Sequence, residues 1–463
     1  MLPNLSDTIC AIATPPGTGA IAVLRISGPE TFPVMEKIFR THQQKDFSQL
    51  KPRTTYFGVI KDDTAILDEV IIILYRAPHS YTGEDAAEIM CHGSGLIQRQ
   101  IIALLNHQGI RMAQGGEFTL RGFQQGKFDL AQAEAVADLI AADSKAAHDL
   151  ALKQMRGGYS AKILELRTKL VRFSALIELE LDFSEEEVEF ADRTQLSNLL
   201  NELKDEIIAL VASFAKGNVM KKGIPVAIIG KPNTGKSTLL NALLNEEKAI
   251  VSEIPGTTRD VIEDTIIIDG FSFRFIDTAG LRQSDDTIEN LGIERTVEAI
   301  KQAQVILHVF DISETNPEAL FQEIAEFKAH LKDTSRKWIL IGNKTDKLAG
   351  TPKGFPDWVE LETLFVCAKK KENIPLITAT LSRIMASENI SDNTIVSSAR
   401  HYEALMKTLE AVESIEQGFE QQLPSDLIAT DIRRALHFLG TITGQISTNE
   451  ILNSIFEKFC IGK

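Results

Sequence analysis

Ile224-Pro-Val-Ala-Ile-Ile-Gly-Lys-Pro-Asn-Thr-Gly-Lys-Ser237 is a short apolar run that leads directly into a glycine-rich turn. The turn matches the pattern G-x-x-x-x-G-K-S in full, and the mostly apolar residues from Thr238 to Leu244 predict a helix. A glycine turn between a strand and a helix surrounds phosphates with backbone N–H groups. In such a loop Lys236 reaches the β- and γ-phosphate oxygens, and the Ser237 hydroxyl ligates Mg²⁺. A chance glycine turn is the alternative, and both flanks argue against it.

Two further segments predict which base is bound and where the nucleotide state is sensed. Asp277-Thr-Ala-Gly280 ends an apolar strand, so that Asp277 can hold Mg²⁺ through water and the Gly280 N–H can meet the γ-phosphate. Asn343-Lys-Thr-Asp346 ends another strand, and the carboxylate of Asp346 suits the two ring-edge donors that guanine has and adenine lacks. The three segments, in this order over about 120 residues, predict GTP rather than ATP.

The residue that would orient the attacking water differs from that of Ras-like enzymes. Leu281 follows Gly280, at the position where Ras-like enzymes carry the glutamine that orients the attacking water. Hydrolysis therefore needs another group.

Composition limits the class of protein. A chain of 463 residues predicts two to four domains, and 44% hydrophobic with 24% charged residues is typical of a globular protein. The net charge of −15 argues against coating a polyanion, so any contact with nucleic acid needs a local basic patch. No apolar run approaches the ~20 residues that span a bilayer. We expect a cytoplasmic protein without a membrane anchor.

The cysteines give no sign of a metal centre. Cys10, Cys91, Cys367 and Cys460 lie far apart, with no C-x-x-C pair. Reduced cytosolic thiols are the simplest interpretation of the first three.

The pattern changes along the chain and predicts four segments. Residues 1–120 read as a mixed α/β unit with β-type runs, and 121–222 follow helical periodicity. The G domain occupies 223–384, and helical periodicity returns over 385–463, where Ser447-Thr-Asn-Glu450 predicts a capping box. Helices on both sides of an intact G domain predict one helical domain with the G domain inserted into it.

Some charged positions stay ambiguous on pattern alone. Arg25 closes an apolar strand and Glu84 follows a turn; charges at such places are more often solvated than ligands. The chain ends Cys460-Ile-Gly-Lys463, which does not fit a prenylation signal. On its own, this tail is most simply a frayed end.

A family resemblance is carried by segments spread over essentially the whole chain. They are Ala13-Thr-Pro-Pro-Gly17, Leu24-Arg-Ile-Ser-Gly28, Tyr81-Thr-Gly-Glu-Asp85, Gly116-Glu-Phe-Thr-Leu-Arg121, Lys127-Phe-Asp-Leu-Ala-Gln-Ala-Glu-Ala135, Gly230 to Ser237, Gly256-Thr-Thr-Arg-Asp260, Asp277-Thr-Ala-Gly-Leu-Arg282 and Cys460-Ile-Gly-Lys463. Together they resemble the MnmE (TrmE) family of tRNA-modification GTPases. The last segment is the most diagnostic, because other bacterial GTPases share the nucleotide-binding segments but end differently.

The resemblance implies a multidomain fold and a set of partners. The fold would be a mixed α/β N-terminal domain that dimerises and binds a tetrahydrofolate one-carbon donor (5-formyl or 5,10-methylene type), a helical domain, and an inserted Ras-like, doubly wound G domain. The implied partners are a second copy of the chain, tRNA, and the FAD-carrying protein MnmG (GidA) in a heterotetramer or larger complex. Together they would modify position 5 of the wobble uridine, U34, by carboxymethylaminomethyl addition.

The resemblance also implies the site residues. Those that contact GTP would be Asn233, Thr234, Gly235, Lys236, Ser237, Thr238, Ser252, Thr257, Thr258, Asp277, Thr278, Ala279, Gly280, Asn343, Lys344, Asp346, Ala368 and Lys369. K⁺ would be held by Asn233, Ser252, Ile254 and Thr257, and Mg²⁺ by Ser237 and Thr258. The folate would contact Arg25, Glu84, Lys127 and Lys463.

Catalytic roles follow from the same resemblance. K⁺ between the α- and γ-phosphates would neutralise developing charge as an arginine finger does, beside Lys236. Glu289 would orient the attacking water through a bridging water, in place of the missing glutamine. Cys460 is the candidate for the modification chemistry.

Three positions depart from the family pattern. Cys367-Ala-Lys369 replaces Ser-Ala-Lys in the loop that supports the base, and we expect a modest effect because its backbone still meets guanine O6. His92-Gly-Ser94 replaces His-Gly-Gly, and Thr18 replaces an arginine of many members.

Two other functions compete with tRNA modification. A regulatory GTPase of ribosome assembly would share the G domain but would need neither the folate-type residues nor the Cys460 tail. Membrane remodelling is disfavoured, because the sequence has no basic amphipathic helix or apolar anchor.

Overall fold

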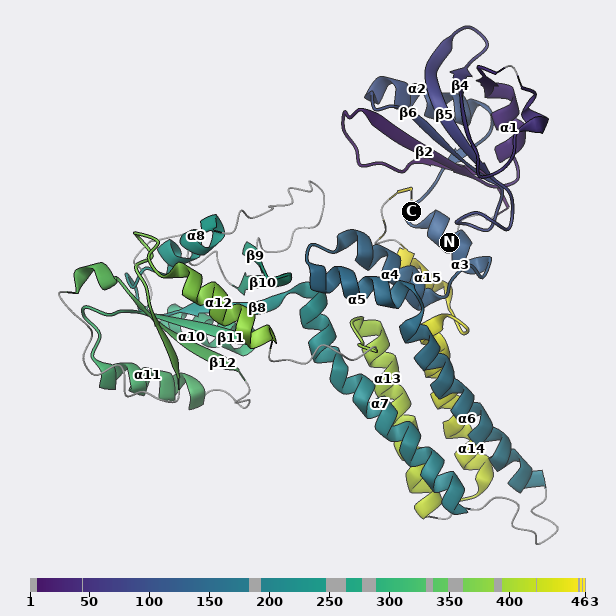
Figure 1. Cartoon of the computed structure of the whole chain (residues 1–463). Coiled ribbons are helices and arrows are strands. Elements are labelled where there is room, and N and C mark those ends of the chain that lie inside the picture. Colours follow the sequence, from purple (N-terminus) through teal and green to yellow (C-terminus); the bar gives the residue numbers. More distant parts are fainter. Residues whose placement is uncertain are drawn as a thin grey trace. The chain divides into compact units, whose positions relative to one another are not determined.

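The computed structural model describes residues 6–43, 45–182, 193–246, 264–276, 289–329, 336–348, 361–386, 394–421, 423–456, 459 and 461–462. It divides into two compact units, each discontinuous in sequence. The first comprises Met1–Ala137, Gln154–Ile207 and Ala404–Lys463, and the second comprises Asp138–Lys153 and Ile208–Glu403. The four domain ranges expected from the sequence stay predictions, whereas the fold class, mixed α/β units with a helical part, is confirmed (Figure 1).

The first unit begins with a sheet that, within the described residues, has seven strands in the order β3-β4-β5-β6-β2-β1-β7. The pairings are antiparallel except for that of β1 with β7. The strands are β1 (Ile9–Ile12), β2 (Ile21–Ser27), β3 (Phe39–Thr41), β4 (Thr55–Lys61), β5 (Ile66–Tyr75), β6 (Ala86–His92) and β7 (Arg111–Met112). A short 3₁₀ turn, η1 (Phe47–Gln49), precedes β4.

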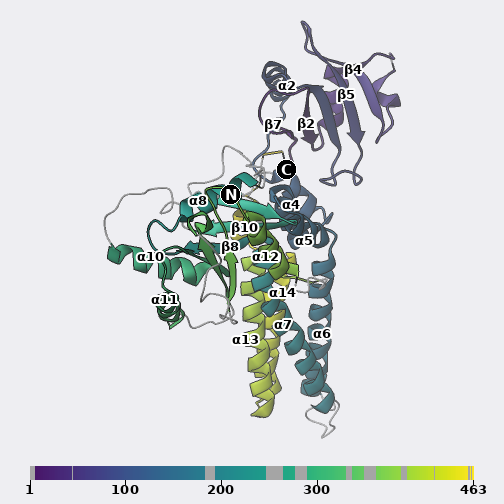
Figure 2. The same cartoon turned by 60° about the vertical axis from the view of Figure 1, so that its left-hand side comes forward.

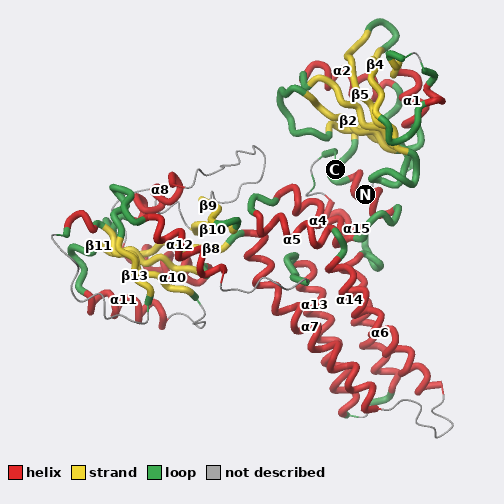
Figure 3. Tube along the Cα trace, viewed as in Figure 1, coloured by secondary structure: helices red, strands yellow, loops and turns green. Residues whose placement is uncertain are grey.

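One face of this sheet is covered by helices, and the other is open over β4 and β5. The covering helices are α1 (Thr31–Ile38) and α2 (Gly95–His107) (Figure 3). They pack on alternate strand residues such as Leu24, Ile72 and Ile89. Because side chains alternate along a strand, the residues between these point to the opposite face. There Phe57 pairs with Ile71, Ile71 pairs with Met90, and Met90 pairs with Val23.

The strand register places an apolar stripe across the open face. Phe57 and Ile71 are exposed by 52% and 40%, and Met90 and Val23 are half-buried.

Short helices follow the sheet and meet the end of the chain. They are α3 (Glu117–Gln124), α4 (Leu130–Ala141) and, near the C-terminus, α15 (Asn449–Phe456). Leu120, Leu130, Leu452 and Phe456 share one apolar cluster. The first and last parts of the sequence are therefore packed together in this unit.

Long helices form the remainder of the helical part. They are α5 (Lys145–Met155), α6 (Gly158–Asp182), α7 (Arg193–Lys222), α13 (Ala399–Glu420) and α14 (Ser425–Thr443) (Figure 2). Within the first unit, Phe173 of α6 meets Phe419 of α13 edge to face, and Lys169 of α6 pairs with Glu202 of α7 at 2.6 Å. The buried residues Leu166, Leu170, Phe173 and Ile177 show the helical period expected from the sequence.

The second unit contains the doubly wound sheet. Its six described strands lie in the order β13-β12-β11-β8-β10-β9, parallel except for the β9–β10 pair. They are β8 (Ile224–Ile229), β9 (Asp264–Ile268), β10 (Phe271–Ile276), β11 (Val305–Asp311), β12 (Lys337–Asn343) and β13 (Glu362–Phe365). The accompanying helices are α8 (Lys236–Glu246), α10 (Glu289–Gln302), α11 (Pro317–Ala329) and α12 (Ile374–Ala386), with the 3₁₀ turn η3 (Thr345–Lys347).

Two details differ from the sequence-based prediction. β6 was not expected as a strand, yet it lies in the middle of the first sheet. The cap of α15 is shifted by one residue, because the Thr448 hydroxyl, and not that of Ser447, accepts from the backbone N–H three residues on, at Ile451. Among the described helices, none has the length and apolar character needed to cross a bilayer.

Candidate functional site

The phosphate loop connects β8 to α8 at the carboxyl edge of the second sheet. Neighbouring strands β10 and β11 lie on opposite sides of β8, and a ligand crevice forms where the strand order reverses in this way. Gly230 has φ +137°, and a Cβ there would lie 2.0 Å from the Val309 carbonyl oxygen. Gly235 has φ +95°, and a Cβ there would lie 2.2 Å from Nδ2 of Asn343. Glycine is required at both positions, as the sequence pattern predicts.

The lysine of the loop is folded back onto the loop. Nζ of Lys236 donates to the backbone oxygens of Gly230 and Lys231 at 2.7 and 2.8 Å. Burial lowers the pKa of Lys236. A half-buried ammonium group whose hydrogen-bond acceptors among the described residues are carbonyl oxygens is suited to an anion at the same place, which is what a nucleotide phosphate provides.

Asn343 joins the phosphate loop to the loop that supports the base. Its Nδ2 donates to the Thr234 carbonyl at 2.8 Å, and its Oδ1 accepts from the Ala368 N–H at 3.0 Å. The side chain is buried, so its position is fixed without a nucleotide. The structure therefore brings together three of the segments that the sequence singled out.

Lys344 makes a second connection to the phosphate loop. Its Nζ donates to the Asn233 carbonyl at 2.6 Å and lies 2.7 Å from Oδ2 of Asp311, at the end of β11. Both Lys344 (φ 67°) and Asn233 (φ 61°) have left-handed backbones, which non-glycine residues adopt only where their surroundings hold them.

The base-specifying carboxylate is held by the residue that departs from the family pattern. The Cys367 thiol donates to Oδ1 of Asp346 at 3.2 Å. This bond, together with the charges of Lys370 and Lys369, lowers the pKa of Asp346. The carboxylate is therefore ionised, as its predicted role of accepting from guanine requires.

Several predicted nucleotide and metal residues lie outside the described residues. They are Ser252, Ile254, Thr257, Thr258, Asp277, Thr278, Ala279 and Gly280. Glu289 begins α10, but its side chain is not described. Ser237 and Thr238 lie in the first turn of α8, after the phosphate loop.

A second candidate site is a cavity of about 230 Å³ in the first sheet. Its lining includes Arg25, Ser27, Tyr75 and Glu88. Glu88 accepts from Nη2 of Arg25 at 2.8 Å and from the Tyr75 hydroxyl at 3.2 Å. A cation and a carboxylate that share a partly buried cavity can bind a ligand with both acidic and donor groups.

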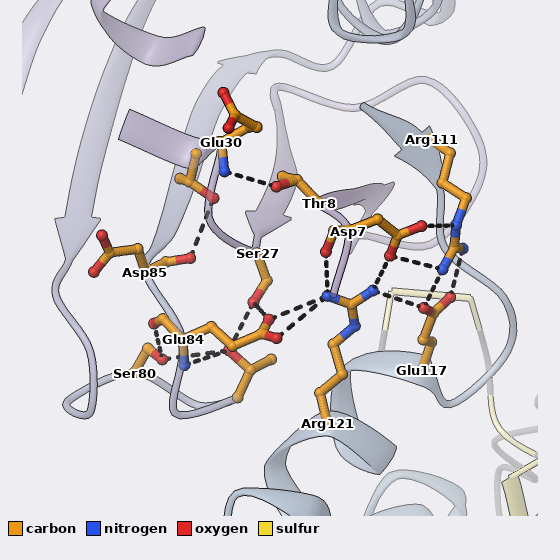
Figure 4. Close-up of polar contacts among 12 residues, drawn as sticks. Asp7, Thr8, Ser27, Glu30, Ser80, Glu84, Asp85, Arg111, Glu117 and Arg121 are labelled. Atoms are coloured by element: carbon orange, nitrogen blue, oxygen red, sulfur yellow. Dashed lines mark hydrogen bonds and ion pairs between the residues drawn. The ribbon is translucent and has the colours of Figure 1, made fainter. Parts of the chain in front are cut away.

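Glu84 does not line this cavity but belongs to a buried ionic cluster beside it (Figure 4). Its carboxylate accepts from the Ser27 hydroxyl at 2.6 Å and from Nη1 of Arg121 at 3.3 Å. Arg121 is almost fully buried and also pairs with Asp7 and Glu117. Lys127 donates to the Pro78 carbonyl at 2.8 Å.

The ionic cluster holds the carboxylates of Glu117 and Asp7 in the charged state. Burial alone would raise the pKa of Glu117, but hydrogen bonds from Arg111, Gln114 and Arg121 lower it. Burial would also raise the pKa of Asp7, but its hydrogen bonds with Arg111 and Arg121 and the charges of these two residues lower it. Because a buried charge is costly unless it is paired, this cluster fixes the backbone on which Ser27 and Glu84 are placed.

The C-terminal tail reaches the cavity. Ile461 forms a β-bridge with Gly115, and the Gly462 carbonyl accepts from Nη1 of Arg25 at 3.4 Å. Cys460 and Lys463 themselves lie outside the described residues. Arg25 thus lies between Glu88 and the tail, and is not a solvated charge.

Sequence reasoning missed Glu88 and Asp311. Each is one carboxylate at a strand position, and its partner comes from a different strand or loop. Glu88 could have been identified as a charged residue between apolar neighbours in β6. Asp311 could have been identified as a charged residue at the end of the apolar run Val305–Asp311.

The doubly wound sheet, the phosphate loop and the preformed Asn343–Asp346 segment define a guanine-nucleotide-binding domain of the P-loop type. Comparison with known proteins agrees. Residues 8–127 match the family model described as the GTP-binding protein TrmE N-terminus, and residues 130–460 match that of the MnmE helical domain.

Relatives match over the whole chain. A tRNA modification GTPase MnmE of Flavobacterium psychrophilum is 50% identical over 458 residues, which cover 99% of each chain. Proteins of the same description from Cytophaga hutchinsonii and Bacteroides thetaiotaomicron are each 48% identical, over 99% of this chain and 98% and 99% of their own. The chain belongs to the MnmE family, and it is a GTPase of tRNA modification.

Proposed function

We propose that this GTPase acts with an FAD-dependent partner of the MnmG type to modify position 5 of the wobble uridine U34 of certain tRNAs, with a tetrahydrofolate derivative as one-carbon donor. The observation that carries the proposal is the contact of the C-terminal tail with Arg25 at the cavity. It brings the segment that includes Cys460 to a binding site in the same unit as the N-terminal sheet. A GTPase without substrate chemistry would have no use for this arrangement.

The cavity is proposed to bind part of the folate. Its ~230 Å³ lies below the roughly 300–1,000 Å³ of most ligand pockets, so it suits the pterin ring better than the entire cofactor. Glu88 then takes the carboxylate role beside Arg25, while Glu84 supports the cavity wall through Ser27. Lys127 and Lys463 are proposed to meet the acidic tail of the folate. Bound there, the folate would supply the one-carbon unit.

Hydrolysis is proposed to depend on K⁺ and on association of two G domains. Asn233 is proposed as a K⁺ ligand and lies within the described residues, where the Lys344 ammonium group contacts its carbonyl and supports its left-handed backbone. Ser252, Ile254 and Thr257 are proposed to complete the K⁺ site. Mg²⁺ is assigned to Ser237 and Thr258, and Glu289 is assigned to water positioning beside Lys236. The cations would supply charge neutralisation for the transferring phosphoryl group.

The N-terminal sheet is proposed to form the homodimer, through the open face that carries Phe57 and Ile71. The working complex would then contain two copies of this chain, the FAD-carrying partner and tRNA, in the cytoplasm.

One paired experiment tests this function. The full chain, its FAD-dependent partner, folate donor and unmodified tRNA are incubated with GTP in K⁺ or in Na⁺ at equal ionic strength. GTP turnover and modified uridine are measured on the same sample. We expect faster turnover in K⁺, and modified uridine with the wild type.

The tail variants separate the two activities. Cys460→Ser and deletion of residues 460–463 should keep GTP turnover within about two-fold while modified uridine is lost, as expected for groups outside the G domain. Full modification of uridine by the truncated chain would show that the tail has no role in the modification. A regulatory GTPase would then be the better-supported function. Equal turnover in K⁺ and Na⁺ would overturn the cation assignment alone.

A further inference from the structure

A carboxylate outside the recognised nucleotide-binding segments lies against the base-recognition residues. Asp311 is the last residue of β11, and in the parallel pairing of β11 with β12 its register partner is Asn343. The backbone N–H of Ile312, the next residue, donates to the Asn343 carbonyl at 3.1 Å. Asp311 therefore sits beside the start of the base-recognition segment.

Asp311 is fixed from several sides. Its side chain is exposed by only 7%, and Oδ1 accepts from the Ser313 hydroxyl at 2.6 Å and from the Ser313 N–H at 3.0 Å. Oδ2 lies 2.7 Å from Nζ of Lys344 and 3.4 Å from Nζ of Lys347. Burial alone would raise the pKa of Asp311, but the hydrogen bonds from Lys344 and Ser313 lower it to about 2.

Lys344 connects Asp311 to the phosphate loop. Its Nζ lies between the Asp311 carboxylate and the Asn233 carbonyl, so one ammonium group joins the ends of β11 and β12 to the loop. Without Asp311, an ammonium on a flexible four-carbon stem would keep only a neutral carbonyl partner. The left-handed conformations of Lys344 and Asn233 would then lose a group that holds them.

We propose that Asp311 is a positioning residue for guanine-nucleotide binding, which acts by holding Lys344 between the base-recognition segment and the phosphate loop. Asp311 touches neither the base nor the reacting phosphate in this scheme. Its effect therefore concerns affinity, is equal for GDP and GTP, and spares the hydrolytic step.

The test is a double-mutant cycle in the full chain. Dissociation constants for a fluorescent GDP and for a non-hydrolysable GTP analogue are measured for the wild type, Asp311→Asn, Lys344→Ala and the double variant. We expect Asp311→Asn to raise both constants by about ten-fold or more, because it removes one partner of a buried ion pair. When Lys344 is already replaced by alanine, Asp311→Asn should change both dissociation constants by less than about two-fold. The two effects are not additive, because Asp311 acts through Lys344.

Two more variants keep the result interpretable. Ser313→Ala removes one of the bonds to Asp311 and should raise the GDP constant about two- to three-fold, again only when Lys344 is present. Glu314→Gln removes a carboxylate that is 76% exposed three residues away, and should leave both constants unchanged. Turnover at saturating GTP should stay within about two-fold in Asp311→Asn.

Two results would overturn the proposal. The first is an unchanged GDP constant in both Asp311→Asn and Ser313→Ala. The second is full additivity with Lys344→Ala, since Asp311 would then act on general stability and not through Lys344. Melting temperatures are measured for all variants to identify any that fail to fold. If Asp311→Asn fails to fold, the GDP dissociation constant of Ser313→Ala tests the proposal in its place.

Discussion

At the scale of single residues, the base site depends on a thiol where the family pattern has a hydroxyl. Cys367 is buried and donates to Asp346, the residue that is proposed to accept from guanine. A thiol is a weaker donor than a hydroxyl, but it still restricts the carboxylate to one orientation. The modest effect expected from the sequence is consistent with this geometry, and the size of the effect can be measured.

The ligand can report on this contact directly. Inosine nucleotides lack the exocyclic amino group of guanine, so the GDP-to-IDP affinity ratio measures the contact of that group with Asp346. Cys367→Ala should reduce this ratio about three-fold or more, since one hydrogen bond contributes about 1 kcal/mol, and Cys367→Ser should restore or increase it. A ratio that is the same in wild type, Ala and Ser variants would show that Cys367 does not orient Asp346.

Residue-level prediction identified the segments that the structure brings together. Asn343 and Lys344 contact the phosphate loop, a contact that the sequence pattern did not specify, and their binding of GTP stays a prediction. Glu88 and Asp311 could not be assigned, since a lone carboxylate does not show which cation it meets. Arg25 is the intermediate case: the resemblance favoured a functional role, and the contacts with Glu88 and Gly462 explain why it is not solvated.

At the scale of elements, the phosphate loop is tightly packed against the segment that begins at Asn343. Gly235 leaves no room for a side chain, because a Cβ would lie 2.2 Å from the Asn343 amide. Its left-handed backbone adds a cost of about 1–2 kcal/mol for any L-residue. The loop and the base-recognition segment therefore cannot move apart independently.

Gly235→Ala should accordingly lower GDP affinity by about 10²-fold or more, through strain at φ +95° and displacement of Asn343. Titration with fluorescent GDP measures the change. Gly109→Ala is the matched control, because its φ is +87° but a Cβ there would meet nothing within 4 Å. It should cost some stability and leave GDP affinity unaltered. A Gly235→Ala variant with wild-type affinity would contradict the close packing of Gly235 on Asn343.

Elements were predictable where their periodicity was strong. The strand that leads into the phosphate loop and the helices with apolar residues at helical spacing were expected and are present. β6, Ala-Ala-Glu-Ile-Met-Cys-His, was not expected, because alanine and glutamate are poor strand formers. It forms a strand because β2 and β5 pair with it on both sides, which is a tertiary effect that local propensity does not contain.

At the scale of the whole molecule, the open face of the first sheet is the proposed dimer surface. It includes the exposed Phe57 and Ile71, whereas the other face is covered by α1 and α2. The covered face accounts for the fold of the domain, and the open face remains available for a partner.

A charge on the open face should weaken the dimer. Phe57→Asp is expected to raise the dimer dissociation constant at least about ten-fold, because burial of an unpaired carboxylate opposes association. Light scattering over a range of protein concentrations measures it. Leu96→Asp is the control, since Leu96 is 58% exposed on α2 at the covered side of the sheet and should leave association unchanged. If Phe57→Asp associates like the wild type, the dimer uses another surface.

The discontinuous first unit also has a consequence for biogenesis. Helix α6 and the first half of α7 leave the ribosome well before α14, which packs on α6, has been synthesised. Roughly 200 residues, Ile208 to Glu403, lie between, and at about 5–20 residues per second they take some 10–40 seconds to translate. During this interval Leu166, Leu170, Phe173 and Ile177 lack the apolar surface that α13 and α14 later supply. A nascent chain paused inside the G domain should therefore be a substrate for chaperones that bind exposed apolar helices, and release should follow synthesis of the last 60 residues or so.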